Sequence, residues 1–157
     1  MVEQKFRKLA LGGTFDILHK GHQKTLDQAF KLSEKVMIGL ASDRLVEKIR
    51  KKHQIASYKE RKKALEKFLQ RKNIISRAEI SPLEIRYGVA HKLEDLDAIM
   101  VSRETYSTAL EINKVRNKNS LKPLNIITLS KLEAENGKPI SSTRIRAGEI
   151  DVEGHVL

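Results

Sequence analysis

The chain has 157 residues and no cysteine, and its 31 lysines and arginines against 20 acidic residues give a formal charge of +11. This length suits one domain, 1–157, with a core large enough to fold alone. The lack of cysteine excludes disulfides, thiolate zinc sites and a cysteine nucleophile. No apolar run approaches the roughly 18 residues of a membrane span, and the N-terminus lacks the apolar core of a signal peptide, so we expect a cytoplasmic protein. The basic excess favours a polyanionic partner, either nucleic acid or a phosphorylated small molecule, and is equally typical of a thermophile's surface.

The predicted elements alternate between short apolar strands and amphipathic helices. In chain order they are strand 6–13, helix 20–34, strand 35–42, helices 42–52 and 58–71, strands 74–81 and 98–102, helix 105–117, strand 125–130 and, after a turn at 135–139, helix 141–146.

This alternation predicts an α/β fold, a Rossmann-like doubly wound parallel sheet of five strands with helices on both faces. The continuous apolar run at 35–42 is typical of a buried parallel strand. Ligands of such sheets bind beyond the carboxyl ends of the strands, where the strand order reverses. We therefore expect the loops after the first, fourth and fifth strands to meet in one crevice.

The stretch GGTFDILHKGH (12–22) directly follows the first strand. Gly12 and Gly13 permit a tight turn and a close approach of the backbone to a ligand. Gly21 lies at the start of the next helix, where unpaired N–H groups and the helix dipole attract phosphate. The spacing is that of neither a dinucleotide fingerprint nor a Walker loop.

His19 and His22 are three residues apart around this helix start, so both rings can face the same anion. Imidazole N–H groups there can donate hydrogen bonds to oxygens that gain charge in a transition state. The alternatives are simple capping of the helix and a zinc pair, although the chain offers no obvious third ligand.

Two signatures in this sequence carry a resemblance to a known superfamily. GTFDILHKGH (13–22) looks like the HxGH signature of the nucleotidyltransferases, and ISSTRIR (140–146) is similar to their second, ISSTxxR-type signature. Between them, VSRETYSTALEINKVRNKNSLKPL (101–124) closely resembles the archaeal-type phosphopantetheine adenylyltransferases. The resemblance covers nearly the whole chain.

The resemblance implies an HxGH nucleotidyltransferase fold and a place in coenzyme A biosynthesis. The expected reaction is transfer of AMP from ATP to 4′-phosphopantetheine, with dephospho-coenzyme A and pyrophosphate as products. Mg²⁺ is expected with ATP, and no protein side chain is identified as its ligand. No membrane or nucleic-acid partner is expected, and the oligomeric state is left open.

Catalytic roles follow from the resemblance, position by position. In the family, the histidines matching His19 and His22 stabilise the transition state at the α-phosphate, and Arg144 would add a cationic clamp. A lysine after the second strand holds the transferred and attacking phosphates. Lys48 is the first choice for it and Lys51 the second, while a solvated basic helix face is the alternative for either residue.

Nucleotide contacts are implied for both signatures and for the region between them. These residues are Gly12, Gly13, Thr14, Phe15, Asp16, Gly21, Arg103, Glu111, Ser141, Ser142 and Thr143. Thr14 would also lie near the attacking phosphate, and Asp16 either contacts the ligand or braces its loop. Arg103 and Glu111 follow the spacing of bacterial relatives, Arg61 is expected to be structural, and ordinary helix capping is the alternative for the serines.

Other functions are weighed against this one. FAD synthetases and glycerol-3-phosphate cytidylyltransferases share the GTFDxLHxGH loop, but cytidylyltransferases usually carry RTxGISTT where this chain has AENGKPISSTRIR. A nucleic-acid-binding module is less favoured, because aromatic residues make up only 4% of the chain and no stacking motif is present. A non-catalytic nucleotide sensor is disfavoured because both signatures are intact.

Overall fold

The computed structural model describes residues 4–49, 54–130 and 132–157 and contains one five-stranded, all-parallel sheet. The strands are β1 (Phe6–Gly13), β2 (Ser33–Ala41), β3 (Ala78–Leu83), β4 (Ala98–Val101) and β5 (Asn125–Thr128). They lie in the order β3-β2-β1-β4-β5, so the chain adds strands on one side of β1 and then on the other. The predicted Rossmann-like, doubly wound α/β sheet is confirmed.

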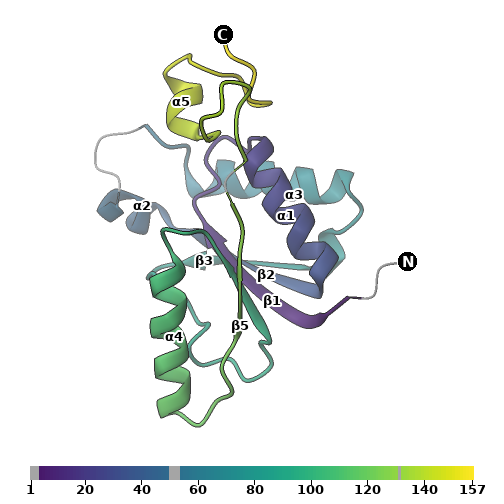
Figure 1. The fold of residues 1–157 in the computed structure, drawn as a ribbon, viewed down its shortest axis with the longest axis vertical. Coiled ribbons are helices and arrows are strands. Elements are labelled where there is room, and N and C mark those ends of the chain that lie inside the picture. The colour runs from purple at the N-terminus through teal and green to yellow at the C-terminus, as the bar shows by residue number, and fades with distance from the viewer. Residues whose placement is uncertain (1–3, 50–53, 131) are drawn as a thin grey trace.

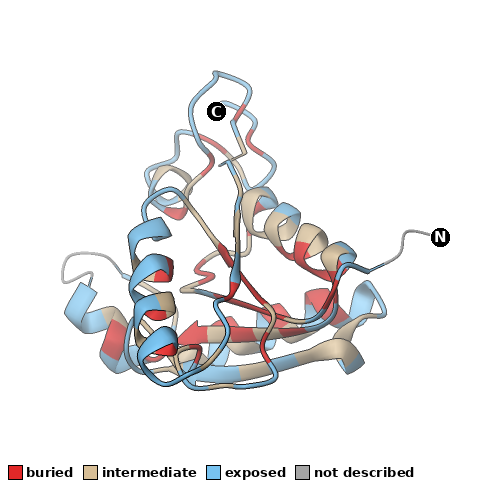
Figure 2. Cartoon of the chain, turned by 60° about the horizontal axis from the view of Figure 1, so that its bottom comes forward, coloured by how far each residue is buried: buried red, intermediate tan, exposed pale blue. Residues whose placement is uncertain are grey.

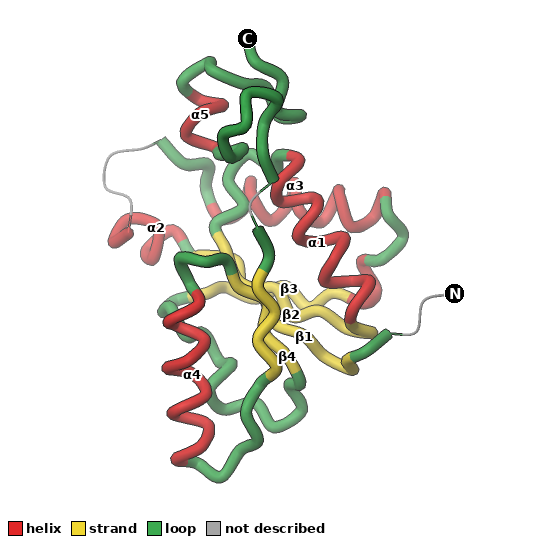
Figure 3. Tube along the Cα trace, in the orientation of Figure 1, coloured by secondary structure: helices red, strands yellow, loops and turns green. Residues whose placement is uncertain are grey.

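The helices cover both faces of this sheet (Figures 1 and 3). The helices are α1 (Lys20–Leu32), α2 (Asp43–Ile49), α3 (Tyr58–Arg71), α4 (Tyr106–Lys118) and α5 (Ser142–Arg146). The buried side chains of α1 and α3 share one apolar cluster with β1, β2 and β4, whereas those of α4 pack in a second cluster on the opposite face. None of the helices in the described part of the chain is long and apolar enough to cross a membrane.

The central strands are buried on both faces, which explains their continuous apolar sequences. Along β1, Leu9 and Leu11 enter the cluster beneath α1, while Ala10 between them enters the cluster beneath α4. Figure 2 shows the buried residues gathered along the strands and the inner sides of the helices. A third, smaller cluster around Ile140 and Ile150 lies in the C-terminal segment, 132–157.

Several predicted boundaries differ from those observed, among them the end of α1 and the start of β3. The helix expected to run to residue 34 ends at Leu32, because Ser33 is extended and already begins β2. The strand expected at 74–81 starts only at Ala78, after a 3₁₀ turn. The Arg77 guanidinium fixes that turn by donating to the carbonyls of Phe30 (2.6 Å) and Ser33 (2.8 Å) at the end of α1.

The helix predicted at 42–52 is seen as α2 over 43–49. Ser42 precedes it, and its hydroxyl accepts the N–H of Leu45 (3.1 Å) as a helix cap. The last three residues of that prediction lie outside the described residues.

Helix α4 offers a matched test of the core beneath it. Ile112 is buried and packs in the second cluster, whereas Leu110 on the same helix is 44% exposed. Ile112→Ala removes packed methyl groups and leaves a cavity, so we expect it to lower the free energy of unfolding by about 2 to 5 kcal/mol. Leu110→Ala is the control and should change it by about 0.5 kcal/mol or less in the same denaturant titration. Equal effects of the two changes would contradict this arrangement.

Candidate active site

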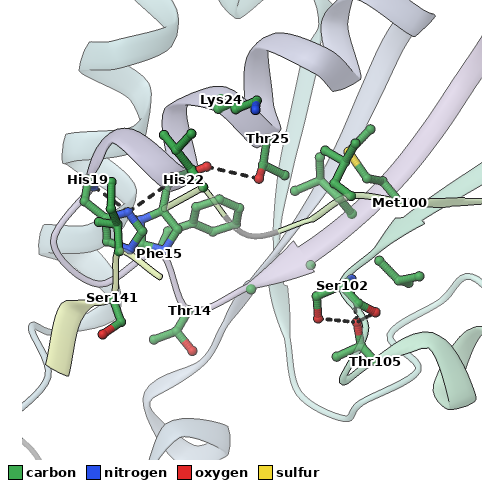
Figure 4. A pocket seen from close by; sticks show the side chains of 18 of the residues that line it. Thr14, Phe15, His19, His22, Lys24, Thr25, Met100, Ser102, Thr105 and Ser141 are labelled. Carbon is green, nitrogen blue, oxygen red and sulfur yellow. Dashed lines mark hydrogen bonds between the residues drawn. The ribbon is translucent and has the colours of Figure 1, made fainter. Parts of the chain in front are cut away.

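A pocket of about 610 Å³ lies at the carboxyl ends of β1, β4 and β5. The start of α1 forms one wall, with His19, Gly21 and His22, and the residues that begin α5 form another. Figure 4 shows His19, His22 and Phe15 together near Ser141, with Ser102 and Thr105 across the pocket. The expected meeting of the loops after the first, fourth and fifth strands is therefore observed.

The loop from β1 to α1 has an unusual backbone. Phe15 and Ile17 both have left-handed conformations, with φ of 50° and 48°. Such values are rare outside glycine and rarest for a β-branched residue such as isoleucine, and each costs about 1–3 kcal/mol. Phe15 is buried, and its ring lies 3.1 Å from the point that a Cβ on Gly13 would occupy. Glycine at position 13 thus leaves room for the ring that anchors the loop.

A buried arginine fixes the start of this loop. The guanidinium of Arg61 donates to the carbonyls of Thr14 (2.9 Å), Ala41 (2.8 Å) and Ala56 (2.8 Å). It also pairs with Asp43 at 3.2 Å. Arg61 is 2% exposed and lies on α3 behind the pocket, so it positions the loop without lining the ligand space.

The two histidines cap α1 reciprocally. The N–H of His22 donates to Nδ1 of His19 (3.3 Å), and the N–H of His19 donates to Nδ1 of His22 (3.4 Å). The rings stack with centroids 3.7 Å apart and an interplanar angle of 17°. Each Nδ1 accepts a hydrogen bond, so a neutral ring carries its proton on Nε2. Burial lowers the pKa of His19 to about 4, which keeps this imidazole neutral at physiological pH.

The beginning of α5 faces the histidines. Ser141 is its N-cap, and the hydroxyl accepts the N–H of Arg144 at 3.3 Å. Ser142 donates its hydroxyl to the carbonyl of Asp16, which joins α5 to the loop after β1. Ser141, Ser142 and Thr143 all line the pocket. Ser141 thus both caps α5 and lines the pocket.

Most of the loop residues predicted to contact the nucleotide line this pocket. They are Gly12, Gly13, Thr14, Phe15, Gly21, Ser141, Ser142 and Thr143, together with the histidines. Asp16 is not among the lining residues: its buried carboxylate is paired with Arg146 on α5.

Arg144 and Lys48 also lie away from the lining. The Arg144 guanidinium pairs with Glu149 (2.9 Å) and donates to the carbonyl of Pro139 (2.8 Å). Lys48 is exposed near the end of α2. Lys51 lies outside the described residues.

Arg103 and Glu111 lie in the region between the two signatures. Arg103 is exposed in the turn before α4. Glu111 lies on α4 and accepts a hydrogen bond from the Tyr87 hydroxyl, which raises the pKa of Tyr87. Neither Arg103 nor Glu111 is among the residues lining the pocket.

Sequence reasoning missed six polar residues of the lining, which are Lys24, Thr25, Ser102, Thr105, Thr128 and Ser130. Lys24 and Thr25 lie three and four residues after Gly21, so the helical repeat turns them to the same side of α1. Ser102 and Thr105 follow β4, and the N–H of Ser102 donates to the Thr105 hydroxyl (3.0 Å). Helical spacing could have identified Lys24 and Thr25. The rule that ligands bind at the carboxyl ends of parallel strands could have identified Ser102 and Thr105.

A model of the cytidylyltransferase-like family matches residues 10–148, and the chain belongs to that family. Within it, the chain belongs with the archaeal phosphopantetheine adenylyltransferases. It is 43% identical to the phosphopantetheine adenylyltransferase of Methanopyrus kandleri, over 94% of this chain and 92% of that protein. It is 42% identical to that of Methanothermobacter thermautotrophicus, over 99% and 93%. A crystal structure of a protein with unknown function from Archaeoglobus fulgidus aligns with a TM-score of 0.70 and 30% identity, over 85% of this chain and 99% of that one.

The depressed pKa of His19 makes a pH-dependent contribution to stability. Between the ordinary pKa of 6.5 and the folded value of about 4, the unfolded chain binds a proton that the folded chain does not. The free energy of unfolding should therefore fall as the pH is lowered through this window, by at most about 3 kcal/mol from this residue. Denaturant titrations from pH 7 to pH 4 would measure it.

His19→Asn keeps a capping side chain but cannot titrate, so its stability should depend less steeply on pH in this window. His155→Asn, which changes an exposed histidine, is the control. An unchanged slope in His19→Asn would contradict the assignment.

Proposed function

We propose that the chain transfers AMP from ATP to 4′-phosphopantetheine, giving dephospho-coenzyme A and pyrophosphate. The observation that carries the proposal is the reciprocal histidine cap, which lines the same pocket as the start of α5. Family membership and the similarity to archaeal phosphopantetheine adenylyltransferases support the choice of donor and acceptor.

The reaction requires no covalent intermediate on the protein. A phosphate oxygen of the acceptor forms a bond to the α-phosphorus of ATP, and the bond from that phosphorus to the oxygen bridging to the β-phosphate breaks. Pyrophosphate leaves with that electron pair. Because the attacking phosphate is already an anion, catalysis reduces to positioning the two ligands and stabilising charge.

The histidines supply part of that stabilisation. With Nδ1 of each ring accepting a backbone N–H, we assign the Nε2–H groups of His19 and His22 to the α-phosphate oxygens, where charge grows in the transition state. Donors fixed in this way need no reorganisation during the reaction. The low pKa of His19 means that its donor is imidazole rather than imidazolium.

The remaining phosphates are assigned to the opposite wall. Ser141 and Thr143 offer hydroxyl groups to the β- and γ-phosphates, Ser142 offers its N–H, and Lys24 adds positive charge from α1. Arg144 would join them only by exchanging its contacts with Glu149 and Pro139 for the ligand. The glycines and Phe15 let the loop backbone approach the nucleotide.

The acceptor phosphate is assigned to Thr14 and to a lysine after β2. Lys48 is exposed on α2, so its role requires the acceptor to extend from the pocket toward the carboxyl end of β2, and Lys51 is the alternative. Arg103 and Glu111 stay candidates for outer contacts with the nucleotide: Arg103 directly follows the lining residue Ser102, and Glu111 lies on α4, the helix capped by the lining residue Thr105.

Mg²⁺ is expected to arrive with ATP. The described lining contains no carboxylate, and no cluster of three His, Cys, Asp or Glu residues suited to a metal is found among the described residues. Mg²⁺ is commonly held through substrate phosphates and water. Of the side chains in the described lining, the hydroxyls of Ser142 and Thr143 would help to hold the metal beside the phosphates, and its chemistry would be to neutralise phosphate charge.

The formal charge of +11 suits two phosphorylated ligands, and the proposed reaction needs neither a nucleic acid nor a membrane. We place the reaction in the cytoplasm, where ATP is supplied.

Pyrophosphate release tests the proposal directly. The protein would be assayed with Mg-ATP and 4′-phosphopantetheine, with CTP and glycerol-3-phosphate, and with ATP and FMN. Turnover with the first pair alone is the expected result. Turnover with another pair would retain the chemistry but overturn the acceptor, and binding of ATP without turnover in any pair would favour a nucleotide sensor.

His22→Ala tests the transition-state role. Loss of a fixed donor at the α-phosphate should lower kcat by about 100-fold or more, with little change in ATP affinity. Steady-state kinetics and calorimetric ATP binding would measure the two effects, with His155→Ala as the control. A near-normal kcat in His22→Ala would refute the role.

A further inference from the structure

Asp16 is a buried carboxylate beside a pocket proposed to bind polyphosphate. It is 3% exposed and lies three residues before His19. An uncompensated carboxylate in this position would repel a phosphorylated ligand and would be costly to bury. Asp16 therefore requires a positively charged partner.

The partner is an arginine from the far end of the sequence. Arg146 Nε donates to Oδ2 of Asp16 (3.1 Å), and Arg146 Nη2 contacts Oδ1 (3.0 Å) and Oδ2 (2.9 Å). The N–H of Ala56 also donates to Oδ1 (3.3 Å). A planar guanidinium meeting both carboxylate oxygens fixes the orientation as well as the charge of the pair.

Arg146 occupies the final position of the ISSTxxR-type signature, ISSTRIR. The structure turns this arginine toward the loop after β1, whereas Arg144, two residues earlier, turns toward Glu149. The Arg146 side chain of this signature thus links α5 to the loop after β1.

A second bond makes the same connection through the backbone. The Ser142 hydroxyl donates to the carbonyl of Asp16. Asp16 therefore contacts α5 through both its carboxylate and its backbone carbonyl. It lies between Phe15 and Ile17, the two loop residues with left-handed backbone conformations. One residue joins the strained loop that leads to the histidines with the helix that begins at Ser142.

We propose that Asp16 and Arg146 are a positioning pair for the transfer reaction, an inference that rests on the proposed function. The pair sets the distance and angle between the histidine wall and the Ser141–Thr143 wall, so that both meet the same triphosphate. Neither residue touches the reacting atoms. Arg146 also neutralises Asp16, so the ligand meets a wall without net negative charge at this point.

The pair bridges two separate apolar clusters. Phe15 packs in the large cluster with α1 and α3, whereas Ile145, next to Arg146, packs in the small C-terminal cluster. Each cluster consists of apolar side chains and does not include the ion pair. The pair therefore sets the relative position of the histidine wall and the Ser141–Thr143 wall, and it contributes less to the folding of either wall.

The test compares Arg146→Lys, Arg146→Gln and the double variant Asp16→Asn/Arg146→Gln by kcat, KM for ATP and Tm. Arg146→Lys retains the charge but loses the two-point contact. We expect its kcat to fall by about 10- to 100-fold with a near-normal Tm, because small misplacements of reacting groups cost this much. Arg146→Gln should lower both kcat and Tm, since Asp16 is left buried and unpaired.

The double variant separates positioning from stability. It removes the buried charge, so its Tm should recover toward that of the wild type while its kcat stays low. Lys122→Gln is the control, because it breaks an exposed ion pair with Asp97 remote from the pocket. A normal kcat in Arg146→Lys, or recovery of kcat together with Tm in the double variant, would overturn the proposal.

A measurement independent of turnover distinguishes failure of this inference from failure of the proposed function. Long-range ¹⁵N–¹H NMR of the imidazoles reports which ring nitrogen carries the proton. In the wild type and Lys122→Gln, His19 and His22 should show fixed Nε2–H tautomers, and in Arg146→Lys these signals should shift toward averaged values. Unchanged imidazole signals in Arg146→Lys would overturn the pair, whereas a wild type that is inactive with every substrate would overturn only the proposed reaction.

Discussion

The turn from β1 into α1 is the constraint on which the site depends. Within a few residues the chain must leave the central strand and start a helix whose first N–H groups face the pocket. To do so, Phe15 and Ile17 adopt left-handed backbone conformations. This conformational strain persists only because contacts with the surrounding structure enforce it. The Arg61 guanidinium, bonded to the Thr14 carbonyl, and the buried Phe15 ring fix this conformation from the side of the core. The reciprocal cap of His19 and His22 then follows directly, because both rings take their orientation from the helix start.

Two buried charged side chains beside the pocket are paired behind its lining, and Lys24 brings a positive charge to the lining itself. The carboxylate of Asp16 and the guanidinium of Arg61, both buried, have charged partners behind the lining, in Arg146 and Asp43. The groups that face the pocket are mostly hydroxyls, backbone N–H groups and imidazoles. The excess of basic residues over the whole chain can then attract phosphorylated ligands at long range, while short-range geometry is left to donors that need no change of protonation.

The C-terminal segment completes the site from outside the sheet. Its small cluster around Ile140 and Ile150 packs apart from the two sheet cores. The N–H of Lys20, in the first turn of α1, donates to the carbonyl of Val152 (2.9 Å). Together with the contacts of Ser142 and Arg146 to Asp16, this bond attaches 132–157 to the start of α1, so residues far apart in the sequence form adjoining walls of one pocket.

The sequence by itself determined the alternation of strands and helices, the parallel sheet, the crevice at its carboxyl edge and the chemistry of the loop at 12–22. These follow from local periodicity and from motifs whose residues are close in the sequence. Only the tertiary structure decided that Arg146 rather than Arg144 turns toward the loop and that Asp16 is paired behind the lining. Arg103, Glu111 and Lys48 were predicted from the family resemblance, and the described lining of the pocket does not include them. The physical reason is that the partner of a charged side chain depends on distances between segments up to 130 residues apart, which no local pattern encodes.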